Sequence, residues 1–216
     1  REAILKLCSR FTDDYWLERD RDAVYPHDFH KSMAEAGWLG IAMPESVGGA
    51  GLGITEAAIM MQAVAESGGG MTAASSIHGP VFSLEPIARF GTQEQQQRMI
   101  PPILTGEQKM CFAVTEPNVG LDTTKLKTRA ERCDGGYRVN GEKIWITNGG
   151  IAQVYTVFAR TEGTDGKITA FVVEAGWAGL TTDTARNRRS LAELATVGDI
   201  EWVGTGHGAP LTEGAA

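Results

Sequence analysis

The spacing of apolar residues changes once along the chain, near residue 108. Before that point apolar residues recur every three or four positions, as at Ala57, Met61 and Val64. This spacing matches the turn of an α-helix and predicts an amphipathic helix over residues 55–66. The first part of the chain is therefore predicted to be helical.

Local signals mark the ends of other helices in this part. Thr92 followed by Gln95 forms a capping-box pattern, which predicts the start of a short helix that continues through residue 98. Pro26 suits the first turn of another helix, and Gly37 suits its C-terminal end. The glycine-rich segment 44–53 cannot form a regular helix, so we predict a loop there.

From Lys109 onward the apolar period changes to two, which is typical of strands that bury one face. The predicted strands cover residues 129–133, 137–139, 142–147, 154–161 and 168–174. Asp134-Gly135 and Asn140-Gly141 separate the first three, and both dipeptides favour tight hairpin turns because Asn and Gly tolerate positive φ. Residues 163–166 predict another turn. Closely spaced antiparallel strands indicate a small barrel or sandwich.

A helical block followed by a strand block predicts an α+β protein with more than one domain. We expect an N-terminal all-α helical domain over residues 1–108, followed by an antiparallel β-barrel or sandwich domain over residues 109–182. Residues 183–216 form an atypical tail, in which a short helix is predicted at 184–195 and a strand at 200–203. We expect this tail to be poorly anchored.

Composition narrows the class of protein. The 216 residues are 42% hydrophobic and carry a formal net charge of −7, which argues against nucleic acid as a partner because phosphate binding needs a basic face. The three cysteines have no metal-like spacing and are expected to be reduced thiols in a cytoplasmic protein. The longest apolar stretch, residues 57–65, is short and interrupted by Gln62, so no membrane span is expected.

Common catalytic and nucleotide motifs do not occur in the sequence. It lacks GxGxxG after a strand, GxSxG, HExxH and a phosphate-binding GxxxxGK. His27 and His30 have helical i,i+3 spacing, but no acidic third ligand accompanies them. We therefore predict no metal site and place both histidines on a solvated helix face.

Two segments carry chemical information. Residues 111–122 leave a strand and turn through Pro117, Asn118 and Gly120, and such a turn can expose backbone N–H groups to an anion or to the edge of a flavin ring. Residues 140–148 place Trp145 beside Thr147 on a predicted strand end, which offers a flat apolar face and a hydroxyl. On spacing alone, Trp145 is better explained as a core residue.

Together these two segments resemble the acyl-CoA dehydrogenase family. In that family a Thr-Glu-Pro-x-x-Gly-Ser-Asp turn and a Trp-Ile-Thr strand line the FAD, and here they correspond to residues 115–122 and 145–147. The resemblance extends back to Gly37-Trp38-Leu39-Gly40 and through residues 90–95 and 101–107. It extends forward through residues 159–161 and 169–174.

The resemblance implies a helical N-terminal domain, a central β-domain, a C-terminal helical domain and FAD as cofactor. It places Phe112, Val114 and Thr115 at the edge of the flavin ring and Gly120 near the pyrophosphate. Trp145 and Thr147 would pack against the ring and hydrogen-bond to it. Leu121 stands where the family usually has Ser, which removes a hydroxyl from the cofactor site.

The implied reaction is α,β-dehydrogenation of an acyl-CoA thioester, with hydride passing to flavin N5 and an α-proton passing to a carboxylate. The implied partners are an acyl-CoA substrate, an electron-transfer flavoprotein or similar acceptor, and further copies of the chain in a homo-oligomer. The family's C-terminal helical domain, which carries the catalytic base, does not follow residue 182. We therefore assign no catalytic residue and expect a truncated form.

Two alternatives remain at this point. The first is a flavin- or acyl-CoA-binding module without dehydrogenase activity. The second is a metal-dependent hydrolase, because residues 191–210 resemble the closing strand of metallo-β-lactamase-type hydrolases around His207. One histidine cannot make a binuclear metal site, which disfavours this second alternative.

Overall fold

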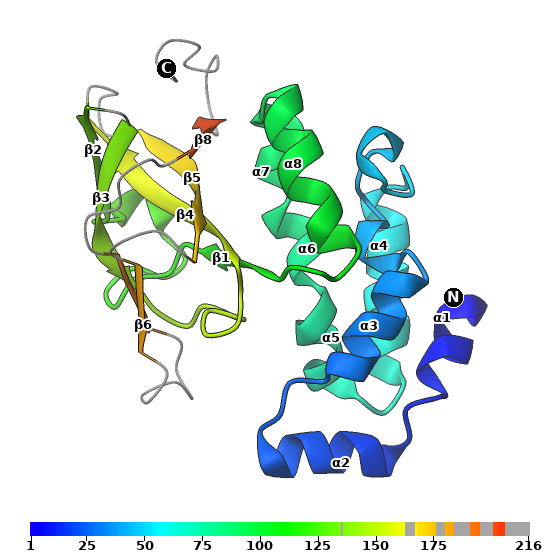
Figure 1. Cartoon of the computed structure of the whole chain (residues 1–216). Helices are drawn as coiled ribbons and strands as arrows, with labels where there is room; N and C mark the ends of the chain where they lie inside the picture. The colour runs from blue at the N-terminus through cyan, green and yellow to red at the C-terminus, as the bar shows by residue number, and fades with distance from the viewer. Residues whose placement is uncertain (135, 163–166, 176–179, 184–190, 195–200, 206–216) are drawn as a thin grey trace. The chain divides into compact units, whose positions relative to one another are not determined.

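The computed structural model describes residues 1–134, 136–162, 167–175, 180–183, 191–194 and 201–205. The chain divides into two compact units, one formed by residues 1–88 and 96–107 and the other by residues 89–95 and 108–216. The first is helical and the second is built on a sheet (Figure 1). The predicted change from helix to strand is confirmed.

Short helices fill the first half of the chain. They are α1 (Glu2–Cys8), α2 (Asp13–Asp22), α3 (His27–Glu35), η1 (Trp38–Gly40), η2 (Glu45–Val47), α4 (Ile54–Glu66), α5 (Gly70–Ile77), α6 (Gly79–Ser83), α7 (Glu85–Phe90) and α8 (Gln93–Leu104). The α4 helix matches the predicted helix, with Ala57, Met60 and Val64 buried along one face. In none of the described helices are length and apolar character together sufficient to cross a membrane.

The α8 helix confirms one prediction and corrects another. Its capping box is present, since the Thr92 N–H donates to Gln95 Oε1 at 2.8 Å and the Gln95 N–H donates to Thr92 Oγ1 at 3.2 Å. The helix does not stop at residue 98 but continues through Pro101 and Pro102. Met99, Ile100, Ile103 and Leu104 are buried at helical spacing, and this packing outweighs the unfavourable prolines.

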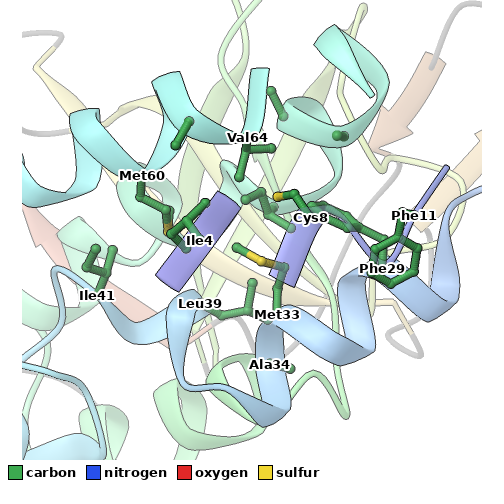
Figure 2. Packing of buried hydrophobic residues seen from close by; sticks show 14 of the residues in the cluster. Ile4, Cys8, Phe11, Phe29, Met33, Ala34, Leu39, Ile41, Met60 and Val64 are labelled. Carbon is green, nitrogen blue, oxygen red and sulfur yellow. The ribbon is translucent and has the colours of Figure 1, made fainter. Parts of the chain in front are cut away.

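Side chains from several helices form the core of the helical unit. Ile4 and Cys8 of α1, Met33 of α3, and Met60 and Val64 of α4 belong to one buried cluster (Figure 2). An aromatic group extends it, with Phe29 in edge contact with Phe11 at 5.2 Å and with Trp16 at 5.1 Å between ring centroids. His30 is buried as well, so the predicted solvated face for this histidine is wrong.

The second unit is a mixed sheet. Its strands are β1 (Met110–Ala113), β2 (Arg129–Cys133), β3 (Gly136–Lys143), β4 (Val154–Thr161), β5 (Ile168–Glu174), β6 (Leu180–Asp183), β7 (Leu191–Leu194) and β8 (Glu201–Thr205). They lie in the order β6-β7-β3-β2-β4-β5-β8, and β1 pairs with β4. The β2, β4 and β5 strands cover the predicted residues.

The sheet is not purely antiparallel, which corrects the prediction. The β1 and β2 strands both pair with β4 in parallel. Residues 144–153 connect β3 to β4, and they are long enough to carry the chain past β2 instead of returning it beside β3 in a hairpin. Strand spacing in the sequence cannot distinguish these two routes.

Three further predictions are wrong. Asn140-Gly141 is not a turn but lies inside β3, where neither residue has a positive φ. The predicted strand 142–147 ends at Lys143. The predicted helix 184–195 contains β7 in its described part. Strand 200–203 is confirmed in part by β8. The turns at 135 and 163–166, most of the tail and His207 lie outside the described residues.

Candidate functional site

The turn that follows β1 is the first part of the site. The Glu116 N–H donates to the Val119 carbonyl at 3.0 Å and the Val119 N–H donates back at 3.1 Å, which closes a tight turn over Pro117 and Asn118. Both turn residues are exposed, while Glu116 is buried. The turn therefore projects two exposed residues while its first side chain enters the interior.

The Glu116 carboxylate is held by several donors. It accepts hydrogen bonds from the Lys127 N–H at 2.6 Å, the Thr128 N–H at 2.9 Å and the Thr128 hydroxyl at 2.6 Å. Lys143 Nζ donates to the same carboxylate at 2.9 Å, forming an ion pair whose side chains are 5% and 0% exposed. A buried charge requires such a full set of partners.

Burial and hydrogen bonding shift the pKa of each member of this ion pair in opposite directions. Burial alone would raise the pKa of Glu116, but hydrogen bonds from Thr128, Lys143 and the Lys127 and Thr128 N–H groups lower the pKa to about 2. Burial lowers the pKa of Lys143, and the Glu116 carboxylate partly offsets this effect. At neutral pH, Glu116 is an anion whose oxygens are already engaged.

Lys143 also joins two segments that are distant in the sequence. Its ammonium donates to the Val114 carbonyl at 2.9 Å as well as to Glu116. The next residue continues the link, because the Ile144 N–H donates to the Thr115 carbonyl at 2.9 Å. The chain leaving β1 and the chain leaving β3 therefore run side by side at this point.

Trp145 follows directly and has an unusual backbone. Its φ is 58°, in the left-handed region, and its side chain is 57% exposed. This conformation costs roughly 1–2 kcal/mol for a residue other than glycine and is a genuine outlier for a bulky side chain. Asn148 is also left-handed, and its carbonyl accepts from the Ile151 and Ala152 N–H groups. The chain after β3 is thus a shaped loop rather than a strand end.

Comparison with known proteins identifies the family. Residues 1–107 match the pattern described as "Acyl-CoA dehydrogenase, N-terminal domain", and residues 111–199 match "Acyl-CoA dehydrogenase, middle domain". The chain belongs to the acyl-CoA dehydrogenase family. The sequence resemblance is confirmed, and both the candidate turn and the Trp145 loop fall in the part that matches the middle domain.

Individual members of the acyl-CoA dehydrogenase family support this assignment. The chain is 38% identical over 167 residues to the mitochondrial isovaleryl-CoA dehydrogenase of Solanum tuberosum, covering 76% of this chain and 40% of that protein. It is 33% identical over 203 residues to the benzylmalonyl-CoA dehydrogenase of Aromatoleum aromaticum, covering 91% and 52%. The chain thus spans about half the length of the relatives it matches.

A solved structure of a family member shares the fold. The glutaryl-CoA dehydrogenase of Mycobacterium smegmatis, in complex with FADH2, superimposes with a TM-score of 0.79 at 26% identity. The match covers 97% of this chain and 57% of that one. The architecture of a helical unit followed by a curved sheet unit is therefore the acyl-CoA dehydrogenase architecture.

The residues assigned by family resemblance fall into two groups. Phe112, Val114 and Thr115 are half-buried along and after β1, and the Phe112 ring contacts Phe158 at 4.8 Å between centroids. The exposed residues are Gly120, Leu121, Trp145 and Thr147. The Ile144 N–H bond to the Thr115 carbonyl and the Lys143 ammonium bond to the Val114 carbonyl bring these two residues beside the start of the Trp145 loop. Gly120 and Leu121 lie further along the exposed end of the turn.

Lys143 is the residue that the sequence prediction missed. In β3 the side chains of Tyr137, Val139 and Lys143 are buried while Arg138 and Glu142 are exposed. Strand alternation therefore turns Lys143 inward, and a lysine on a buried face requires an acidic partner. Residues 137–143 carry this signal in the sequence, but it was hidden by the predicted turn at Asn140-Gly141.

An open pocket of about 410 Å³ lies beside the Glu116 turn. It is lined by Asn118 and by the exposed face of β2 and β3, where Arg129 and Arg138 alternate with Glu131 and Glu142. The residues assigned to the flavin, all of them described, do not line it. Among the described residues, no three His, Cys, Asp or Glu side chains gather to hold a metal ion.

Proposed function

We propose that this chain forms the FAD-binding part of an acyl-CoA dehydrogenase, which oxidises the Cα–Cβ bond of an acyl-CoA thioester. The observation that carries this proposal is the exposed indole of Trp145, on a left-handed turn tied to Thr115 through the Ile144 N–H. A flat apolar surface with threonine hydroxyls nearby in the chain fits an isoalloxazine ring, which has an apolar face and a polar edge. The residues present therefore fit the cofactor.

In this proposal the chain's residues bind and orient the ring. Trp145 stacks on its face, and the Thr115 and Thr147 hydroxyls hydrogen-bond to its polar edge. Phe112 and Val114 form the apolar border. Bound FAD supplies the acceptor for the hydride that leaves the substrate β-carbon.

The turn residues would meet the rest of the cofactor. An added Cβ at Gly120 would have no atom within 4 Å, so the space beside this residue is open for a pyrophosphate. Leu121 is fully exposed and offers no hydroxyl at the position where the family usually has Ser. An acyl-CoA substrate, an electron-transfer flavoprotein or similar acceptor, and a homo-oligomeric assembly belong to the same proposal.

FAD binding is the first test. Titration of the purified chain with FAD is expected to raise its melting temperature and quench flavin fluorescence. Trp145→Ala is expected to weaken binding at least tenfold, about 1.4 kcal/mol, because the stacking surface is removed. Trp145→Phe, which keeps a flat ring, is the matched control and should lose less. Absence of any FAD response in the unmodified chain would refute the cofactor proposal.

A second candidate is a flavin-binding module without dehydrogenase activity. The contacts and exposure of the candidate acidic residues favour it. The Glu116 oxygens are engaged by four donors. Asp122 is bonded to Thr124 and Lys125, and these contacts lower its pKa. Glu45 and Glu142 are exposed on the surface. A general base must be free to accept a proton and must be held against the substrate α-carbon. Glu116 and Asp122 do not meet the first requirement, and the solvated Glu45 and Glu142 do not meet the second.

Mixing with substrate tests whether this chain supplies a catalytic base of its own. Anaerobic mixing of the FAD-loaded chain with butyryl-, octanoyl- or palmitoyl-CoA is expected to leave the visible flavin absorbance unchanged, because a placed base contributes about 10²–10⁴-fold to the rate. Sodium dithionite should still bleach the flavin, which controls for its ability to be reduced. Rapid bleaching by any acyl-CoA would show that a residue of this chain supplies the base.

A further inference from the structure

The buried Glu116–Lys143 ion pair has no direct part in the proposed cofactor contacts. Lys143 is 0% exposed and Glu116 is 5% exposed, so both charged groups are almost wholly enclosed by the protein. Yet the pair lies between the two segments that carry the candidate flavin residues. Its role must therefore be exerted through the residues around it.

The contacts of Lys143 fix the spacing between these segments. Its ammonium reaches the Val114 carbonyl and the Glu116 carboxylate, which lie on either side of Thr115. The Thr115 carbonyl itself accepts from the Ile144 N–H. Three consecutive residues after β1 are thereby tied to two consecutive residues at the end of β3. Trp145 is the next residue along the chain.

The carboxylate end of the pair is anchored from a third direction. The Lys127 N–H and the N–H and hydroxyl of Thr128 hold Glu116 at the start of β2. Charge-assisted hydrogen bonds are the stronger kind, and a buried setting strengthens them further. The ammonium of Lys143 is therefore attached to a fixed point and not to a mobile side chain.

The backbone of Trp145 shows why such anchoring is needed. Its left-handed φ of 58° is unfavourable for a bulky side chain, and such a conformation persists only where the surrounding structure determines it. The residue just before Trp145 is held by the bond to Thr115, and the residue before that is the buried lysine. The left-handed backbone conformation therefore occurs at Trp145, the first residue after the two that these contacts hold.

We propose that Glu116 and Lys143 are positioning residues that hold Thr115 and the Trp145 loop in the arrangement a flavin ring requires. The ion pair sets the separation of the two segments and fixes the direction in which the chain leaves β3. The consequence for flavin affinity rests on the proposed FAD site. The effect on Trp145 is a property of the chain alone and can be measured without cofactor.

The experiment separates positioning from general stability. Glu116→Gln, Lys143→Met and the double variant are compared with Val173→Ala in the same unit. Val173 is buried in β5 and pairs with Tyr155, so its truncation lowers the stability of this unit without removing any hydrogen bond of the Glu116–Lys143 pair. In each protein without FAD, the indole N–H resonance of Trp145 is followed by NMR, with Trp145→Phe used to assign it. The FAD dissociation constant is then measured by fluorescence titration.

All three ion-pair variants are expected to move the Trp145 resonance and to weaken FAD binding about tenfold or more. Val173→Ala should change the Trp145 resonance and the FAD dissociation constant much less than the ion-pair variants do, although its melting temperature falls. The double variant carries no uncompensated buried charge and keeps the test valid if a single variant does not fold.

Two results would overturn the proposal. One is an unmoved Trp145 resonance in the double variant, which would show that the loop holds its shape without the pair. The other is an equal change in Val173→Ala, which would show that the loop only follows overall stability. If the unmodified chain binds no FAD, the proposed function fails, while the resonance still decides whether the pair positions Trp145.

Discussion

Replacement of Lys143 with methionine is expected to lower the free energy of unfolding by about 3–5 kcal/mol, because it leaves the Glu116 carboxylate buried without its counter-ion. Chemical denaturation of the full chain measures the loss. The Glu116→Gln/Lys143→Met double variant should recover most of it, since two neutral side chains of similar size remain. Lys127→Met is the matched control, because that side chain is exposed and its loss should stay within about 0.5 kcal/mol.

The effect of Lys143→Met is expected to depend on pH. The pKa of Glu116 is lowered in the folded chain from its ordinary value of 4.5 to about 2. The stabilisation that accompanies this shift is fully present above pH 4.5 and is lost as the pH falls toward 2, and it corresponds to about 3 kcal/mol. The difference between the unmodified chain and the variant should therefore shrink over that interval. A constant difference would contradict the assigned ionisation of Glu116.

Gly141→Ala is expected to destabilise the sheet unit by about 3 kcal/mol and to lower its melting temperature by roughly 6–12 °C. A Cβ at this position would lie 2.3 Å from Thr128 Oγ1 and 2.8 Å from Thr128 Cα, so the backbone of one strand must move. The movement also displaces a residue that donates two hydrogen bonds to Glu116.

Gly120→Ala provides the control for Gly141→Ala in the same unit. An added Cβ at Gly120 meets no atom within 4 Å, and the residue has no positive φ, so stability should change by less than about 0.5 kcal/mol. Equal melting temperatures for the two alanine variants would show that the close approach of Gly141 to Thr128 does not limit the packing of β3.

Periodicity and cap signals were enough to predict the elements that are defined locally. The α4 helix follows from the spacing of its apolar residues, and the capping box at Thr92 and Gln95 is present as expected. The β4 and β5 strands occupy the predicted residues and pair with each other antiparallel, although consecutive residues are buried in both. These features depend on residues a few positions apart, which a single sequence shows directly.

Features that depend on distant partners were not predictable in the same way. The parallel pairing of β1 with β4 joins Met110 to Val154, and no local signal specifies such a partner. Gly141 was predicted to form a turn, yet it serves the close approach of Thr128. Trp145 was predicted on a strand end, although the contacts of the preceding residues turn the chain there. In each case tertiary packing overrides a local preference.

The buried ion pair also limits which amino-acid substitutions this chain can tolerate at Glu116 and Lys143 during evolution. A substitution at Glu116 alone or at Lys143 alone leaves one charge stranded in the interior, whereas simultaneous neutralisation removes both charges. The two positions are therefore expected to covary among relatives, appearing either as a charged pair or as a matched uncharged pair. Residues 116 and 143 are expected to be inherited as one unit, although 26 other residues separate them in the sequence.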